Sequence, residues 1–122
     1  MHAHLKLGRR APTADQRRKA LPLGKYLRRS LPPPPPSCNN TDGALIAMFG
    51  NDRYGDCTFA GLANYRAICA AKEGVVSPTL EGDVIRAYLE FTGGKDDGAV
   101  ETEVLNRALD GLALGGCEPQ RR

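Results

Sequence analysis

The sequence predicts a mainly α-helical protein, with a small helical domain over residues 37–122 and an extended, basic, proline-rich arm over residues 1–36. A chain of 122 residues has the size of one domain. The arm holds nine basic residues against one acidic residue, whereas the rest of the chain holds eight against thirteen. Apolar residues in the second part recur at helical spacing, and no segment alternates as a half-buried strand does. We therefore expect a three-helix body and no firm strand.

The arm is interrupted at Gly8, Pro12, Pro22 and Gly24, so we expect it to be extended or at most locally helical. Its charge leaves two interpretations open. The arm binds phosphate, an acidic membrane surface or a partner protein, or it wraps the acidic body of its own chain.

Five consecutive prolines, Pro32–Pro36, separate the arm from the body. Such a run favours a polyproline II rod of about 15 Å, at ~3.1 Å per residue. We expect this rod to hold the arm away from the helices.

The first expected helix covers residues 57–73, with Asp56 as its N-cap. Apolar residues and alanines occupy nearly every side of this segment. A helix that is apolar almost all round is normally buried on all sides, so we expect the first helix to be central.

The second expected helix opens at Ser77, with Pro78 at the first helical position, and runs to about Phe91, with Gly93-Gly94 as its stop signal. The residues expected on its inner face are Leu80, Val84, Tyr88 and Phe91.

The third expected helix runs from Val100 to Leu114, before Gly115-Gly116. Its expected inner face holds Val104, Leu105, Ala108 and Leu112.

Metal and cofactor sites find no support in the sequence. The four cysteines include no CxxC pair, and both histidines lie in the arm. No apolar run approaches the roughly 20 residues that span a bilayer, and the N-terminus lacks the apolar stretch of a signal peptide. We therefore expect no membrane span, reduced thiols and a cytoplasmic protein, with association with a virion as the alternative location.

Cys57 differs from the other cysteines in its surroundings, because it follows a glycine turn at the first turn of the expected central helix. Helix N-terminal amides and the macrodipole stabilise a thiolate, the nucleophilic form of cysteine. Arg53 would assist that effect, while Asp52 and Asp56 would oppose it. The same amides, with the side chain of Asn51, would hold an oxyanion formed on an attacked carbonyl.

This arrangement resembles the papain-like cysteine peptidases, in which a carboxamide stands six positions before a Gly-x-Cys that opens the central helix. Over most of the chain, the ordered segments 7–9, 25–27, 31–37, 50–57 and 92–94 are similar to a group of phage and actinobacterial proteins of papain-like type. The resemblance implies the helical half of a papain-like fold, Cys57 as the nucleophile and Asn51 as the oxyanion donor.

The chain departs from the papain-like pattern in two respects. Asn51 replaces the usual glutamine, which is one methylene longer, and the β half that carries the catalytic histidine has no counterpart. A nucleophilic cysteine needs a base within about 2.6 to 3.2 Å. His2 and His4 are the two histidines in the sequence that could act as this base. The Cys117–Arg122 ending is unlike the start of a β half, which we interpret as a truncation or frame change.

Two functions therefore remain open. One is a cysteine-hydrolase-related protein that keeps the nucleophile and oxyanion segment but is inactive as an isolated chain. The alternative is a non-enzymatic structural or interaction protein, derived from a phage, that displays its basic arm. Either function implies a protein partner or self-association, and the arm would also suit nucleic acid.

Overall fold

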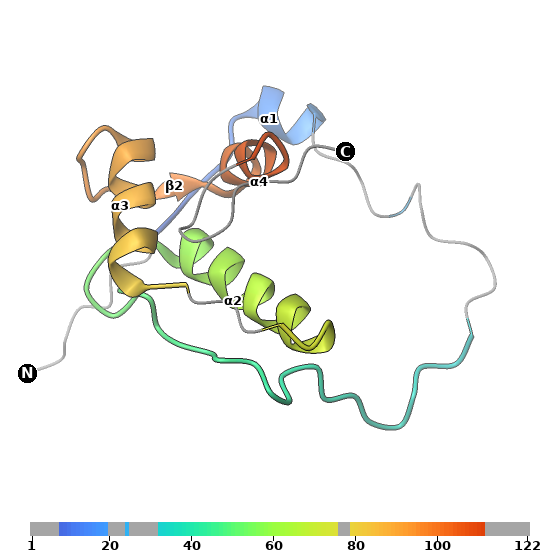
Figure 1. Cartoon of the computed structure of the whole chain (residues 1–122). Helices are drawn as coiled ribbons and strands as arrows, with labels where there is room; N and C mark the ends of the chain where they lie inside the picture. Colours follow the sequence, from blue (N-terminus) through green and yellow to red (C-terminus); the bar gives the residue numbers. More distant parts are fainter. Residues whose placement is uncertain (1–7, 20–23, 25–31, 76–78, 112–122) are drawn as a thin grey trace, which may run out of the picture.

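The computed structural model describes residues 8–19, 24, 32–75 and 79–111, and it is mainly helical, as expected (Figure 1). Its elements in chain order are β1 (Arg9–Arg10), α1 (Ala14–Lys19), α2 (Cys57–Lys72), α3 (Glu81–Thr92), β2 (Ala99–Val100) and α4 (Glu101–Leu109). No helix among the described residues is both long enough and apolar enough to cross a membrane.

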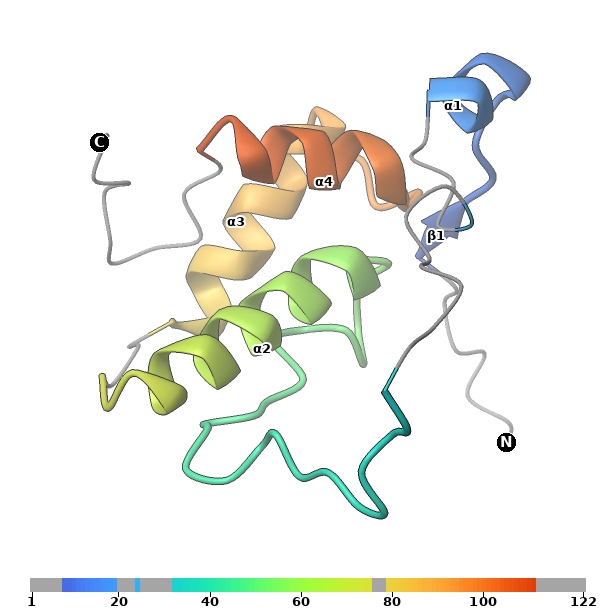
Figure 2. The ribbon, with the colours of Figure 1, turned by 90° about the vertical axis from the view of Figure 1, so that its right-hand side faces the viewer.

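The core lies where α2 meets α3 and α4 (Figure 2). Phe59 of α2 is fully buried and packs edge-on against Tyr88 and Phe91 of α3, with ring centroids 5.7 and 5.5 Å apart. Val104 of α4 and Val84 of α3 complete this core without exposed surface. Two aromatic pairs therefore fix the α2–α3 crossing.

Helix α2 agrees closely with its expected range, and Asp56 stands at its N-cap as expected, although its side chain accepts no hydrogen bond from the helix. The expectation that the helix is buried on all sides is wrong, because Gly61 and Tyr65 are exposed. Its end is a Schellman motif, in which left-handed Gly74 lets the Val75 amide donate to Ala70 O at 2.8 Å.

Helix α3 begins at Glu81, later than the expected start, and the expected opening residues Ser77 and Pro78 lie outside the described residues. Leu80 is 64% exposed, which corrects its expected inward position. It precedes the helix in extended conformation, so the helical period does not govern it. The expected stop is confirmed, since Gly93 is left-handed and the Gly94 amide donates to Leu89 O at 2.7 Å.

Helix α4 spans Glu101–Leu109, and the expected continuation to Leu114 and Gly115-Gly116 lies outside the described residues. Val104 is buried as expected, but Leu105 is 42% exposed. Consecutive residues of a helix point about 100° apart, so Leu105 turns away from the core that Val104 enters.

The expectation of no strand is corrected by a short parallel pair, in which Arg9 aligns with Ala99 and Arg10 with Val100. Three glycines make this pairing possible. A Cβ on Gly8 would lie 2.0 Å from Gly55 O, and a Cβ on Gly98 would lie 2.3 Å from Gly8 O. The backbones therefore approach more closely than side chains would allow. Two residues per strand carry no alternation, so the sequence pattern could not show them.

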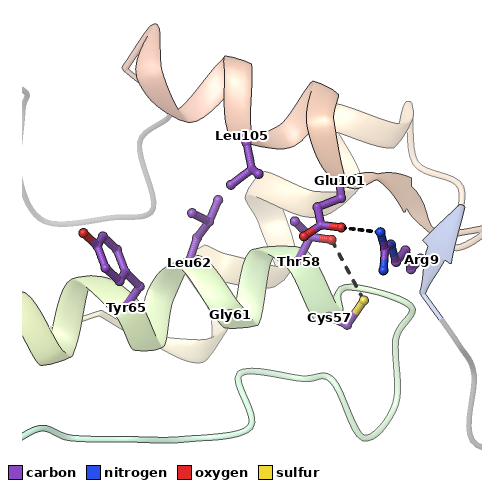
Figure 3. Close-up of a pocket in the computed structure, with 8 residues that line it drawn as sticks. All are labelled: Arg9, Cys57, Thr58, Gly61, Leu62, Tyr65, Glu101 and Leu105. Carbon is purple, nitrogen blue, oxygen red and sulfur yellow. Dashed lines mark hydrogen bonds and ion pairs between the residues drawn. The ribbon is translucent and has the colours of Figure 1, made fainter. Parts of the chain in front are cut away.

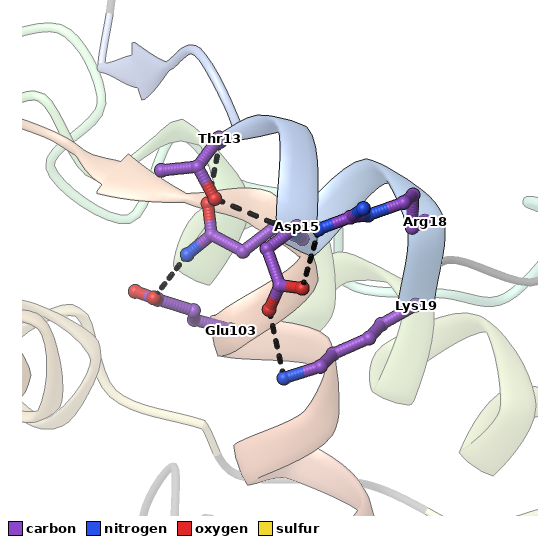
Figure 4. Close-up of polar contacts among 6 residues, drawn as sticks. Thr13, Asp15, Arg18, Lys19 and Glu103 are labelled. Atoms are coloured by element: carbon purple, nitrogen blue, oxygen red, sulfur yellow. Dashed lines mark hydrogen bonds and ion pairs between the residues drawn. The ribbon is translucent and has the colours of Figure 1, made fainter.

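The segment from Thr13 to Lys19 lies beside α4 (Figures 1 and 2). A capping box opens α1, because the Thr13 amide donates to Gln16 Oε1 and the Gln16 amide donates to Thr13 Oγ1. Gln16 Nε2 also donates to Glu103 of α4 (Figure 4). Residues 8–19 thus contact the body, although Pro32–Pro36 follow them and are exposed.

Candidate functional site

Cys57 is the first residue of α2 and is half-buried. A turn over residues 48–54 leads into the helix, where the amides of Arg53 and Tyr54 both donate to Gly50 O. Left-handed Phe49 and Gly50 shape this turn. A Cβ on Gly50 would lie 2.7 Å from Ile85 Cγ1, so the turn packs directly on α3. The packing of this turn on α3 therefore holds the first turn of α2, and with it the Cys57 thiol, in place.

A pocket of about 490 Å³ opens beside Cys57, and its size is within the usual range of small-molecule sites. It is lined by Arg9, Cys57, Thr58, Gly61, Leu62, Tyr65, Glu101 and Leu105 (Figure 3). The charged pair and Cys57 lie toward one end, while Tyr65 lies at the other end along α2. The pocket therefore combines a thiol and a charged end with a mainly apolar groove.

Arg9 reaches this pocket from β1, and its Nη2 lies 2.9 Å from Glu101 Oε2. The two side chains are 67% and 44% exposed, so both remain open to solvent. Neither was predicted from the sequence to belong to the Cys57 site. The only sequence signal was the glycine at position 8, whose backbone contact with Gly55 became visible only in three dimensions.

Asp56, beside the thiol in sequence, is 1% exposed, and neither of its carboxylate oxygens has a hydrogen-bond partner among the described residues. Burial raises the pKa of this carboxyl to about 6, and the nearby carboxylates of Asp96 and Asp52 act in the same direction. A Cβ on Gly50 would lie 3.4 Å from Asp56 Oδ2. The carboxyl thus lies under the turn that precedes α2, and it is not among the groups that line the pocket.

A polar network surrounds the backbone contacts of Gly8 with Gly55 and Gly98. Asp96 Oδ1 accepts hydrogen bonds from the Gly55 amide at 2.7 Å and from the Tyr88 hydroxyl at 3.0 Å. The Gly98 amide donates to the same hydroxyl at 3.0 Å. Burial raises the pKa of Tyr88 to about 12, so the phenol stays protonated and donates to the carboxylate. This network joins α3 to the backbone on both sides of β1.

Asn51 is half-buried in the turn, and its backbone N–H donates to Met48 O at 3.0 Å. It is not among the residues that line the Cys57 pocket. Its assignment as an oxyanion donor therefore stays a prediction.

The described residues contain no histidine, because His2 and His4 lie outside them. Glu101 is the carboxylate that lines the pocket with Cys57. Among the described ranges, no group of three or more cysteine, histidine or acidic side chains is arranged to hold a metal ion.

Four of the five basic residues in the described part of the arm pair with carboxylates of this chain, and the fifth, Arg17, donates from Nε to Pro12 O. Arg9 pairs with Glu101 and Arg10 with Asp97, while Arg18 and Lys19 both pair with Asp15 (Figure 4). Of the two interpretations of the arm, the one in which it wraps its own body gains support from the pairs of Arg9 and Arg10, because Asp15 belongs to the arm itself.

Comparison of the chain with protein-family models, curated proteins and solved structures finds no match. The resemblance to papain-like proteins thus rests on the sequence segments alone.

Proposed function

We propose that this protein supplies the nucleophile of a cysteine-dependent acyl-transfer site, with Cys57 as the attacking thiol. The observation that carries the proposal is the position of Cys57, half-buried at the start of a 16-residue helix and lining a pocket large enough for a small molecule. The backbone N–H groups of the first helical turn would stabilise the oxyanion that forms on an attacked carbonyl. The papain-like resemblance of residues 50–57 supports the same role.

In the proposed reaction, the Cys57 thiolate attacks an acyl carbonyl, a C–S bond forms, and the bond to the leaving group breaks. A group is needed that removes the thiol proton as a base and then donates it to a poor leaving group as an acid, and the described residues contain no histidine to do so. We propose that a partner chain, or a part of this chain outside the described residues, provides it.

An activated ester tests this proposal without the missing base, because p-nitrophenolate leaves without needing a proton. We expect p-nitrophenyl acetate to acylate Cys57 faster than exposed Cys38, with one p-nitrophenolate released per thioester formed. The C57S variant is the control, and mass spectrometry locates the acetyl group. Equal acylation of the two cysteines, or release that persists unchanged in C57S, would refute the assignment.

A second candidate, a non-enzymatic interaction protein, is favoured by a separate surface feature. Leu45, Ile46 and Met48 are each at least half exposed on one segment. Two hydrogen bonds hold that segment against α2. Asn64 Nδ2 donates to Ala47 O at 2.9 Å, and the Ala47 backbone N–H donates to Asn64 Oδ1 at 3.0 Å. Exposed apolar side chains that are held in place are typical of protein contacts. An I46K variant that alters self-association measured by light scattering would support this function, and unchanged association would oppose it.

A further inference from the structure

The pocket beside Cys57 contains a positively charged side chain, Arg9, that has no role in the proposed reaction. Arg9 lines it, and its placement depends on the backbone contact of Gly8 with Gly55 and Gly98. The Ala99 amide donates to Gly8 O at 2.9 Å, which fixes the register of β1. The backbone contacts of Gly8 with Gly55 and Gly98 therefore hold Arg9 at the pocket.

The present partner of Arg9 is replaceable. Glu101 Oε2 forms an ion pair with Arg9 Nη2, and both side chains are open to solvent. An exposed ion pair of this kind is weak. A carboxylate that enters from solvent competes for the same guanidinium, which presents five donors in a planar fork and matches a carboxylate in two-point geometry.

Beyond the charged end, the pocket is apolar along α2 and α4. Leu62 and Leu105 approach from the two helices, and the ring of Tyr65 lies farther along (Figure 3). The exposed carbons of Leu105 and Tyr65 would gain from contact with an apolar group. A ligand thus meets a cation and the thiol first, and apolar side chains next.

We infer that this pocket recognises a small ligand with a free carboxylate beside an apolar group. Arg9 binds the carboxylate, and Leu62 and Leu105 contact the apolar group. This inference rests on the proposed function, because it names the substrate class of the same site, but it concerns binding alone. Arg9 is a specificity-determining residue in this arrangement.

Binding of unreactive ligands tests the inference, using the full chain. The probes are N-acetyl-leucine, its uncharged analogue N-acetyl-leucinamide, and N-acetyl-glycine, each titrated while the amide signals of Thr58 and Gly61 are followed by NMR. We expect N-acetyl-leucine to bind about fivefold more tightly than N-acetyl-leucinamide, the size that an exposed ion pair contributes. It should also bind more tightly than N-acetyl-glycine, which keeps the carboxylate but lacks the apolar side chain. Equal affinities, or no binding of any probe, would overturn the inference.

Two variants and a matched control separate recognition from folding. R9Q removes the preference for the carboxylate, whereas R10Q on the same strand preserves it, because Arg10 faces Asp97 outside this pocket. E101Q frees Arg9 and strengthens binding of N-acetyl-leucine. A preference that survives in R9Q, or weaker binding in E101Q, would refute the role of Arg9.

These ligands do not acylate a thiol, so their binding is independent of the reactivity of Cys57. Selective binding with an unreactive Cys57 would leave the recognition site standing and remove the proposed acyl transfer. A reactive Cys57 without selective binding would do the reverse.

Discussion

Asp56 stands at the start of α2, yet its carboxyl is buried under the preceding turn and caps nothing. Because its pKa in the folded protein is about 6, compared with 3.8 for the free side chain, the folded state binds this proton more tightly than the unfolded state. The free energy of unfolding is therefore highest below the unfolded pKa and falls as pH rises toward the folded pKa.

We predict that the protein loses stability between about pH 4 and pH 6 through this group, by at most roughly 3 kcal/mol from the size of the pKa difference. The D56N variant, which has no proton to lose there, should show a flatter pH profile. Urea unfolding at several pH values measures the difference.

The control for this prediction is D110N, because Asp110 is an exposed carboxylate at the end of α4. Its profile should follow that of the wild-type protein. A D56N protein whose stability falls with pH as steeply as the wild type would show that Asp56 is not the group responsible.

Two glycines of the α3 segment differ in what their backbone requires. Gly93 is left-handed at the helix end, where a side chain is strained, whereas a Cβ on Gly82 meets nothing within 4 Å. We predict that G93A lowers the free energy of unfolding by about 1 kcal/mol. G82A should raise it by about 0.5 kcal/mol or more. Thermal or urea unfolding checks the signs, and a shared sign would contradict this account of the helix.

The β1–β2 pair depends on a glycine with no room for a side chain. We predict that G8A releases β1, because the new Cβ would lie 2.0 Å from Gly55 O. Hydrogen exchange of the Ala99 amide, which donates to Gly8 O, should then accelerate. The matched control is G24A, since a Cβ on Gly24 meets nothing within 4 Å. Unchanged protection of Ala99 in G8A would show that this contact does not hold the strand.

Residues 8–19 join the rest of the molecule through a two-residue pair and several exposed polar contacts. Exposed ion pairs weaken as salt shortens the Debye length from about 10 Å at 0.1 M to about 3 Å at 1 M. We predict that 1 M NaCl accelerates exchange of the Ala99 amide and leaves the Gly94 amide, bonded within the end of α3, unchanged. Equal responses of the two amides would mean that salt acts on the whole fold.

The sequence predicted the parts of this fold that local chemistry determines. The span of α2 and the Gly93-Gly94 stop of α3 follow from periodicity and from the left-handed backbone of glycine. The docking of β1 did not, because it arises from backbone contact between Gly8, Gly55 and Gly98, which are far apart in the chain.

The candidate site divides in the same way. Cys57 was predicted from its turn and helix start, and its place in a pocket agrees with that expectation without testing its role. Arg9 and Glu101 were missed, because only the tertiary fold brings them beside the thiol. The Thr13–Gln16 capping box was a readable local signal for α1.

Competition between two cysteines for one reagent shows whether Cys57 is an activated nucleophile. Cys38 is exposed and Cys57 is half-buried, so access alone makes Cys38 the faster to alkylate. We would treat the full chain with iodoacetamide at pH 7 and measure each rate by mass spectrometry. We predict that Cys57 reacts faster than Cys38 despite its smaller exposure. Alkylation of Cys57 at a rate equal to or below that of Cys38 would contradict it.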